Sequence, residues 1–159
     1  MEVSILRRVL TTQDDLSLTV LRIFLGMVIL PHGAQKLLGW FGGHGFAGTM
    51  QHFTEQMGIP FVFALLAILA ESLGTMGLIV GLCTRIAALG VGVTIGVAAL
   101  LVHIENGFFM NWTGRKAGEG FEFHLLVVGM ALALVIGGGG KWSLDRLITG
   151  EKRRLTGLH

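Results

Sequence analysis

The sequence is poor in cysteine, in proline and in charged side chains. Cys83 is its single cysteine, so neither an intramolecular disulfide nor a Cys-x-x-Cys pair can form, which excludes a quinone-linked thiol oxidase that works through its own cysteines. Only two prolines accompany 25 glycines, and no repeat or polar tract is present, which excludes collagen-like and linker sequence. Charged residues make up 14% of the chain, and the cations form no stripe with interleaved aromatics. We therefore expect no nucleic-acid partner.

Hydrophobic residues dominate instead, at 52% of the 159 residues and a mean hydropathy of +0.72. Four long apolar stretches carry almost every charge at their ends, and they cover about residues 16–38, 61–83, 86–104 and 121–139. Each is near the roughly 20 residues that a helix needs to cross a hydrocarbon layer about 30 Å thick. The sequence predicts one all-α domain over residues 1–159, an integral membrane bundle of four antiparallel helices whose surroundings are the lipid bilayer.

Two short amphipathic segments lie outside the spans. Between the first two stretches, apolar residues recur every three or four positions, as on one face of a helix: Phe46, Met50, Phe53 and Met57. This spacing predicts a short helix lying flat in the outer interface. After the last stretch, Ser143 is a suitable helix N-cap before a small apolar stripe, and the basic run Lys152–Arg154 follows. We expect a C-terminal surface helix whose cations favour anionic lipid.

Glycine pairs spaced by four residues occur in the second and third stretches. The pairs are Gly77 with Gly81 and Gly92 with Gly96. Small residues at this spacing let membrane helices approach closely. We expect tight helix contacts at these positions, with a homodimer contact as the alternative.

The Lys and Arg residues in the connections predict the orientation, because cytoplasmic segments are enriched in cations. One side holds eight of them: Arg7, Arg8, Arg85, Lys141, Arg146, Lys152, Arg153 and Arg154. The other side holds two, Arg115 and Lys116. Both termini are therefore expected in the cytoplasm. The first stretch lacks an Ala-x-Ala-like cleavage site, which predicts an uncleaved first helix.

Six ionisable residues fall in what this orientation makes the outer half of the spans: His32, Lys36, Glu71, His103, Glu122 and His124. Charged groups inside a bilayer are costly unless paired, and they generally face the bundle interior. Glu71 follows Phe61 by ten residues, which places it about 15 Å deep at 1.5 Å per residue. At that depth its carboxylate needs either an imidazole or Arg22 as a partner, or a proton; we expect the protonated form, serving a ligand. Arg22 and Arg85 are candidates for structural charges.

Four interpretations of these polar residues compete. They satisfy one another and only fix the packing, or they form a quinone or small-molecule site in which a histidine donates to a carbonyl oxygen and Glu71 handles a proton. A metal site would use His32, His103 and His124 with a glutamate, and a b-type haem would use two of the histidines. Glu122 and His124 are two residues apart and point some 200° from each other on a helix, which disfavours a shared metal. Haem needs facing histidines at matched depth. We assign no metal and leave the cofactor open, with a quinone preferred.

Six segments carry a pattern that is specific when taken together. They are His32-Gly33-x-x-Lys36-Leu37, Glu71-x-x-Gly74, Gly81-Leu82-x-Thr84-Arg85-x-Ala87-Ala88, His103-x-x-Asn106-Gly107-Phe108-Phe109, Gly120-Phe121-Glu122-Phe123-His124-Leu125-Leu126 and Gly140-Lys141-Trp142-Ser143-Leu144-Asp145-Arg146. Through them the chain resembles the DoxX family of small bacterial inner-membrane proteins over about residues 16–150. The resemblance implies a four-helix bundle in the bacterial inner (plasma) membrane. Carried over by position, it makes functional candidates of His32, Lys36, Glu71, Arg85, His103 and Glu122.

Function varies across that family. Some members are linked to quinone-dependent sulfur oxidation, and others associate with a superoxide dismutase and a sulfurtransferase at the membrane in redox-stress defence. The resemblance therefore implies a redox-associated protein that binds a quinone-like or small polar ligand in the outer half of the bundle. The alternative is a non-catalytic scaffold or assembly subunit that recruits a redox partner. Whether the chain is an enzyme, and whether it forms a homo-oligomer, stay open.

Overall fold

The computed structural model describes residues 5–150, and within that range it is helical without strands. The basic run at residues 152–154, expected to face anionic lipid, lies outside the described residues. The α-helices are α1 (Ile5–Leu10), α2 (Leu16–Leu38), α3 (Gly45–Gln51), α4 (Phe61–Leu69), α5 (Thr75–Val80), α6 (Thr84–Ala98), α7 (Glu122–Gly137) and α8 (Leu144–Thr149). The 3₁₀ turns are η1 (Trp40–Gly42) and η5 (Ile104–Asn106), and the π-helical turns are η2 (His52–Gln56), η3 (Ala70–Gly74) and η4 (Ala99–His103).

Three helical segments of the described chain are long and apolar enough to cross a membrane: Leu16–Leu38, Phe61–Val80 and Thr84–Asn106. The first has the bounds that the sequence predicts. The second ends at Val80, three residues before the predicted end at 83, because Gly81 adopts a left-handed conformation with φ of 74°. Helix α7 has 16 residues, about 24 Å of rise, and ends where Gly138 takes a φ of 81°. Its role as a fourth span stays a prediction.

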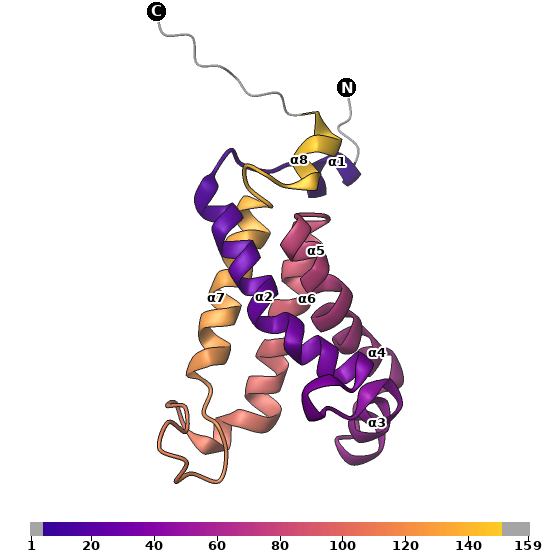
Figure 1. Ribbon diagram of the computed structural model, residues 1–159, viewed down its shortest axis with the longest axis vertical. Helices are drawn as coiled ribbons and strands as arrows, with labels where there is room; N and C mark the ends of the chain where they lie inside the picture. The colour runs from indigo at the N-terminus through magenta and orange to yellow at the C-terminus, as the bar shows by residue number, and fades with distance from the viewer. Residues whose placement is uncertain (1–4, 151–159) are drawn as a thin grey trace, which may run out of the picture.

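The core lies where α2, α5, α6 and α7 meet. Helix α2 crosses the molecule obliquely and packs against α5, η3 and α7, while α6 packs along α7 (Figure 1). Nine buried apolar residues fill this junction: Leu25, Ile29, Leu78, Ala88, Val91, Ile95, Val127, Ala131 and Leu134. Because lipid replaces water around such helices, close van der Waals packing, rather than the hydrophobic effect, holds them together.

Glycines set the closest approaches between the helices. A Cβ on Gly26 would lie 2.9 Å from the carbonyl oxygen of Thr75, and one on Gly33 would lie 2.7 Å from the Cα of Ser72. Helix α2 therefore touches η3 and α5 backbone to backbone, a contact at glycines that the sequence pattern missed. Of the predicted pairs, Gly92 is in close contact with a side chain of α7, since a Cβ on Gly92 would lie 2.9 Å from the Cβ of Ala131. Gly96 has ordinary spacing to Val128, at 3.6 Å.

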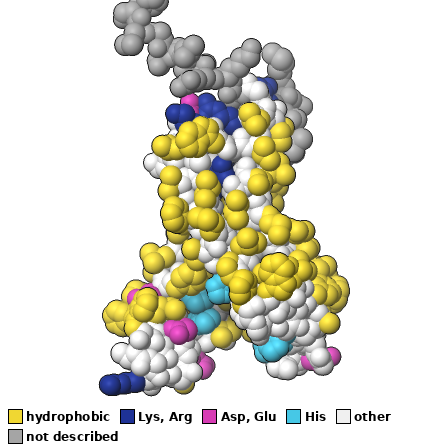
Figure 2. All heavy atoms as spheres, in the orientation of Figure 1, with side chains coloured by type: hydrophobic (Ala, Val, Ile, Leu, Met, Phe, Trp, Pro, Cys, Tyr) yellow, Lys and Arg dark blue, Asp and Glu magenta, His cyan; other side chains and the backbone are white. Residues whose placement is uncertain are grey.

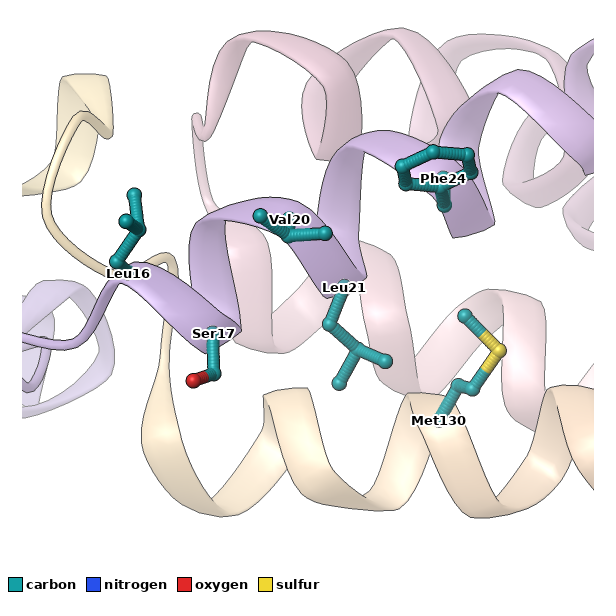
Figure 3. Close-up of a pocket in the computed structure, with 6 residues that line it drawn as sticks. All are labelled: Leu16, Ser17, Val20, Leu21, Phe24 and Met130. Atoms are coloured by element: carbon teal, nitrogen blue, oxygen red, sulfur yellow. The ribbon is translucent and has the colours of Figure 1, made fainter.

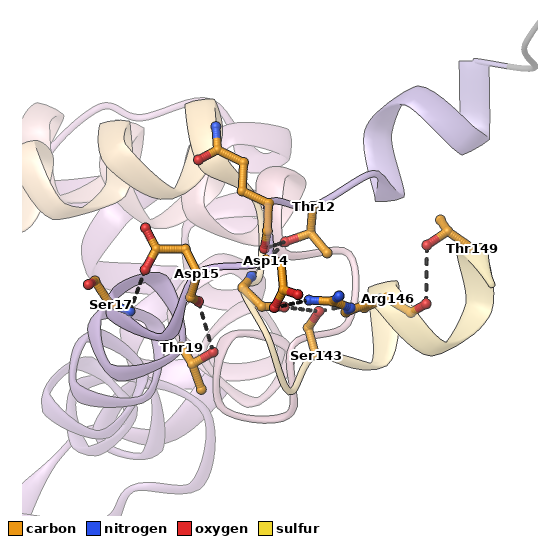
Figure 4. Close-up of polar contacts among 10 residues, drawn as sticks. Thr12, Asp14, Asp15, Ser17, Thr19, Ser143, Arg146 and Thr149 are labelled. Atoms are coloured by element: carbon orange, nitrogen blue, oxygen red, sulfur yellow. Dashed lines mark hydrogen bonds and ion pairs between the residues drawn. The ribbon is translucent and has the colours of Figure 1, made fainter. Parts of the chain in front are cut away.

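Helices α1 and α8 lie together at one end of the molecule (Figure 1). Ser143 caps α8, as predicted, because its hydroxyl accepts a hydrogen bond from the Arg146 amide. Arg146 also forms an ion pair with Asp14 at 2.5 Å, and the Thr12 hydroxyl accepts from the amide of Gly140 (Figure 4). These contacts tie the segment before α2 to the segment after α7.

Helix α3 and turn η2 lie at the opposite end of the molecule (Figure 1). Met50 is buried there against Ala64 and Ile68 of α4, whereas Gln51 and Glu55 face outward. The predicted short amphipathic helix is therefore present, with its apolar face on the second span.

Candidate functional site

A large groove runs between the second span (α4, η3) and the third (α6, η4). Its volume is about 1390 Å³, and residues of α2 and α7 also line it. Most of its lining is apolar, and wall residues such as Phe63, Leu66 and Val93 are more than half exposed in the isolated chain. The groove is therefore open sideways, toward the space that lipid occupies around a membrane protein.

The groove is polar at the end near α3 and the loop over residues 107–121. Figure 2 shows histidine side chains gathered in a hollow between two lobes at that end of the molecule. Five of the six residues singled out from the sequence line the groove: His32, Lys36, Glu71, His103 and His124. They come from all four long helical segments, so the fold assembles one polar cluster from positions far apart in the chain.

Lys36 and Glu71 form an ion pair inside the groove. The Nζ of Lys36 lies 2.5 Å from Oε2 of Glu71, whose side chain is 4% exposed, against 24% for Lys36. The sequence named an imidazole or Arg22 as possible partners of Glu71, and the structure pairs it with Lys36 instead. The partner is Lys36 because of the relative position of the two helical segments. Gly33 packs against the backbone of Glu71, so the last turns of α2, which carry Lys36, lie level with η3. Both Glu71 and His103 belong to π-helical turns, which occur often at functional sites.

His103 and His124 stack against each other, with ring centroids 4.0 Å apart and planes inclined by 39°. The Nδ1 of His103 lies 2.9 Å from the main-chain carbonyl oxygen of Glu119. His124 is only 7% exposed, and its Nδ1 has no hydrogen-bond partner among the described residues. His32 lies across from this pair, with its ring 6.4 Å from that of Phe123. The role of the Glu119 carbonyl was missed, because no side-chain pattern announces a main-chain acceptor.

Glu122 is the sequence candidate that the structure leaves outside the groove lining. Its Oε1 accepts hydrogen bonds from the amide of Met110 at 2.9 Å and from the indole of Trp112 at 3.2 Å. Because Glu122 and His124 point apart at the start of α7, only His124 faces the groove. Glu122 instead holds the 107–121 loop against the start of α7.

Arg22 and Arg85 lie away from the groove and bond to backbone carbonyls. Arg22 is 2% exposed and donates to the carbonyl oxygens of Gly139 and Trp142, both at 2.7 Å, and of Leu78 at 2.9 Å and Ile79. Arg85 donates to the carbonyls of Val135, Ile136 and Thr11. Each guanidinium thus satisfies carbonyls that a helix end or a loop leaves without partners.

A second hollow lies between α2 and α7 near the α1–α8 end. Its volume is about 530 Å³, and Figure 3 shows its lining, which is apolar apart from one hydroxyl: Leu16, Ser17, Val20, Leu21, Phe24 and Met130. This lining contains no ionisable group, and its apolar side chains suit contact with an acyl chain. Within residues 5–150, no three His, Cys, Asp or Glu side chains are arranged to hold a metal ion.

The apolar spans and the groove define a helical integral membrane protein with a polar cluster at one end of a lipid-facing groove. A family model, DoxX, matches residues 17–104, and the chain belongs to the DoxX family. The matched range contains His32, Lys36, Glu71 and His103 but stops before α7.

Two relatives extend the match over most of the chain. The chain is 31% identical over 143 residues to an uncharacterized protein of Haemophilus influenzae, covering 85% of each. It is also 31% identical over 135 residues to the inner membrane protein YqjF of Escherichia coli, covering 85% of this chain and 94% of YqjF. No solved structure matches the chain.

Proposed function

We propose that this protein binds an amphiphilic, quinone-like ligand in the groove between α4 and α6 and is associated with redox chemistry at the membrane. The observation that carries the proposal is the division of the groove into apolar walls and one polar end. A quinone has the same division, with a ring that forms hydrogen bonds and a tail that prefers hydrocarbon. The redox association rests on the resemblance to redox-linked members of the DoxX family.

The two parts of the groove suit the two parts of such a ligand. Phe63, Leu66, Val93 and Val97 form an apolar surface along which a tail lies while remaining in contact with lipid. The ring reaches the imidazoles at the polar end, where a pocket supplies orientation through a few convergent polar groups. The sideways opening supports entry of the ligand from the bilayer rather than from water.

We also propose that the protein lies in the inner membrane with both termini in the cytoplasm. The name of the Escherichia coli relative supports the membrane. The orientation is supported by the cations near the end where α1 and α8 lie, among them Arg7, Arg8 and Lys141, against Arg115 and Lys116 in the loop at the other end. The polar end of the groove then belongs to the outer half of the membrane.

The test measures quinone binding by the wild-type protein and by a variant in which a bulky side chain occupies the groove. A decyl-substituted benzoquinone is titrated into the full-length protein in nanodiscs, and empty nanodiscs correct for partition into lipid. We expect saturable binding that Ala98→Phe abolishes, because Ala98 lines the groove. Ala133→Phe is the matched control, since Ala133 is exposed on α7 outside the groove. Equal binding by both variants would contradict the proposal.

A folded wild-type protein that binds no quinone would support the alternative instead, a scaffold or assembly subunit that recruits a redox partner. Pull-down of the tagged protein from solubilised membranes, followed by identification of the captured proteins, then distinguishes a partner from a homo-oligomer.

A further inference from the structure

The hydrogen bond from His103 to Glu119 determines what kind of ligand head group the groove accepts. A main-chain carbonyl oxygen only accepts hydrogen bonds, so the ring nitrogen that lies 2.9 Å from it, Nδ1 of His103, must be the one that holds the proton. In a neutral imidazole the other nitrogen then has a free lone pair. Nε2 of His103 is therefore a hydrogen-bond acceptor.

This acceptor is available within the groove. His103 lines the groove, and the described part of the structure contains no hydrogen bond to its Nε2. Asn106 donates to the same Glu119 carbonyl at 3.2 Å, so that oxygen holds the ring and the loop in one arrangement. His124, stacked on the ring at 4.0 Å, restricts it from the other side. Rotation of the ring to present a donor would break the Glu119 bond and disturb the stack.

The Lys36–Glu71 pair adds one acceptor to the polar end, because a carboxylate only accepts hydrogen bonds. Lys36 donates one of its three N–H groups to Oε2 of Glu71, and its remaining N–H groups and those of His32 and His124 are donors elsewhere in the groove. The selection for a donating head group is therefore local to Nε2 of His103.

We infer that the head group bound beside His103 donates a hydrogen bond, so that the groove selects a phenol or hydroquinone over the corresponding ether or quinone. This inference rests on the proposed function, and it specifies the chemical form of the ligand. A quinone brings two carbonyl acceptors to a nitrogen that is itself an acceptor, whereas a hydroxyl donates to it. His103 is then the residue that determines which form is bound.

The test compares two redox-inert probes, para-decylphenol and its methyl ether, in binding to the full-length protein in nanodiscs near pH 8. The ether lacks only the donor hydrogen and adds a methyl group, so its size effect is removed by comparing variants. His103→Asn places an amide nitrogen near the position of Nδ1 and removes Nε2. We expect the ratio of phenol to ether affinity to fall by roughly 2- to 12-fold in His103→Asn, the range that one hydrogen bond supplies.

The matched control is His44→Asn, because His44 is exposed and outside the groove, and its ratio should equal that of the wild type. An unchanged ratio in His103→Asn would overturn the inference. So would wild-type binding of a decyl hydroquinone no tighter than that of its quinone, although the groove would still be a ligand site. If no probe, quinone included, binds above empty nanodiscs, the proposed function fails as well.

A measurement on the wild type keeps the inference testable if the variant does not fold. Nitrogen-15 NMR of the protein labelled at histidine separates the two neutral tautomers by the shifts of their ring nitrogens. We expect His103 as the Nδ1–H tautomer, and the Nε2–H tautomer would overturn the inference.

Discussion

The ion pair between Lys36 and Glu71 makes a quantitative prediction about stability. Replacing Lys36 by Met keeps the length of the side chain but leaves the carboxylate of Glu71, 4% exposed, without its cation. Removing one partner of a buried pair typically costs about 3–5 kcal/mol. We expect Lys36→Met to lower the free energy of unfolding by roughly that amount.

The reverse change should cost less. Glu71→Gln leaves the ammonium of Lys36 without its carboxylate, but the Lys36 side chain is 24% exposed and so is less completely buried than that of Glu71. We expect a loss of about 1–3 kcal/mol, the range for an incompletely satisfied polar group. The same variant would fold with undiminished stability if Glu71 were a protonated, ligand-side acid, the expectation drawn from the sequence.

The double variant measures the interaction energy between Lys36 and Glu71 separately from the effect of each single substitution. With both charges removed, Lys36→Met/Glu71→Gln should be more stable than the sum of the single losses predicts, with a coupling energy of at least about 2 kcal/mol. Equilibrium unfolding by sodium dodecyl sulfate in mixed micelles measures all four proteins. Arg115→Met, which removes an exposed cation of the 107–121 loop, is the control and should change stability by less than about 0.5 kcal/mol. A coupling energy below about 0.5 kcal/mol would refute the ion pair.

Three further predictions concern helix packing, Arg22 at the α1–α8 end, and orientation. Gly33→Leu should destabilise the protein by at least about 1–3 kcal/mol in the same assay, because its Cβ meets the backbone of η3, whereas Gly129→Leu, with open space around Gly129, should be silent; equal effects would contradict the contact. Arg22→Met should cost about 3 kcal/mol or more, since four carbonyls lose their donor, and a stable variant would show that they find other partners. Reporter fusions at the C-terminus and within residues 107–121 should report the cytoplasm and the outer side respectively, and the opposite result would reverse the orientation.

Local features of the fold were predictable from the sequence because their causes are local. The first span begins after Asp15, whose carboxylate accepts from the amide of Ser17, and ends at Gly39 with a φ of 75°. An acidic N-cap and a glycine C-cap around an apolar run are visible in the letters alone. The same holds for Ser143 at the start of α8. Where helix α7 ends was less visible, because any of four consecutive glycines could stop it.

The partners of the buried charges were not predictable, because they depend on how two helices are set against each other along their axes. Counting residues from the span ends placed Lys36 near the surface and Glu71 at mid-depth. Helix α2 runs obliquely, and the contact of Gly33 with the backbone of Glu71 brings the two charges level. Arg22, a candidate structural charge that could have paired with Glu71, instead bonds carbonyls exposed by the ends of two other helical segments. No residue type in a sequence indicates which backbone carbonyl oxygens will be left without partners at helix ends.

The polar groups at the two ends of the molecule have different partners, and this difference supports the proposed position of the site at the groove. At the α1–α8 end, Arg22 donates to four carbonyls, and Asp145, 1% exposed, accepts from the amides of Cys83 and Thr84 at 2.6 and 2.8 Å. The side chains of Arg22 and Asp145 thus form their hydrogen bonds with backbone groups, as structural charges do. At the groove end, His103 keeps a lone pair, and His124 bonds to no described residue although it is nearly buried. Burying a polar group without a partner costs free energy. The unpartnered Nδ1 of His124, stacked on His103 beside an open groove, therefore supports the proposal that a ligand binds there, since an apolar ring of the same size would pack without that cost.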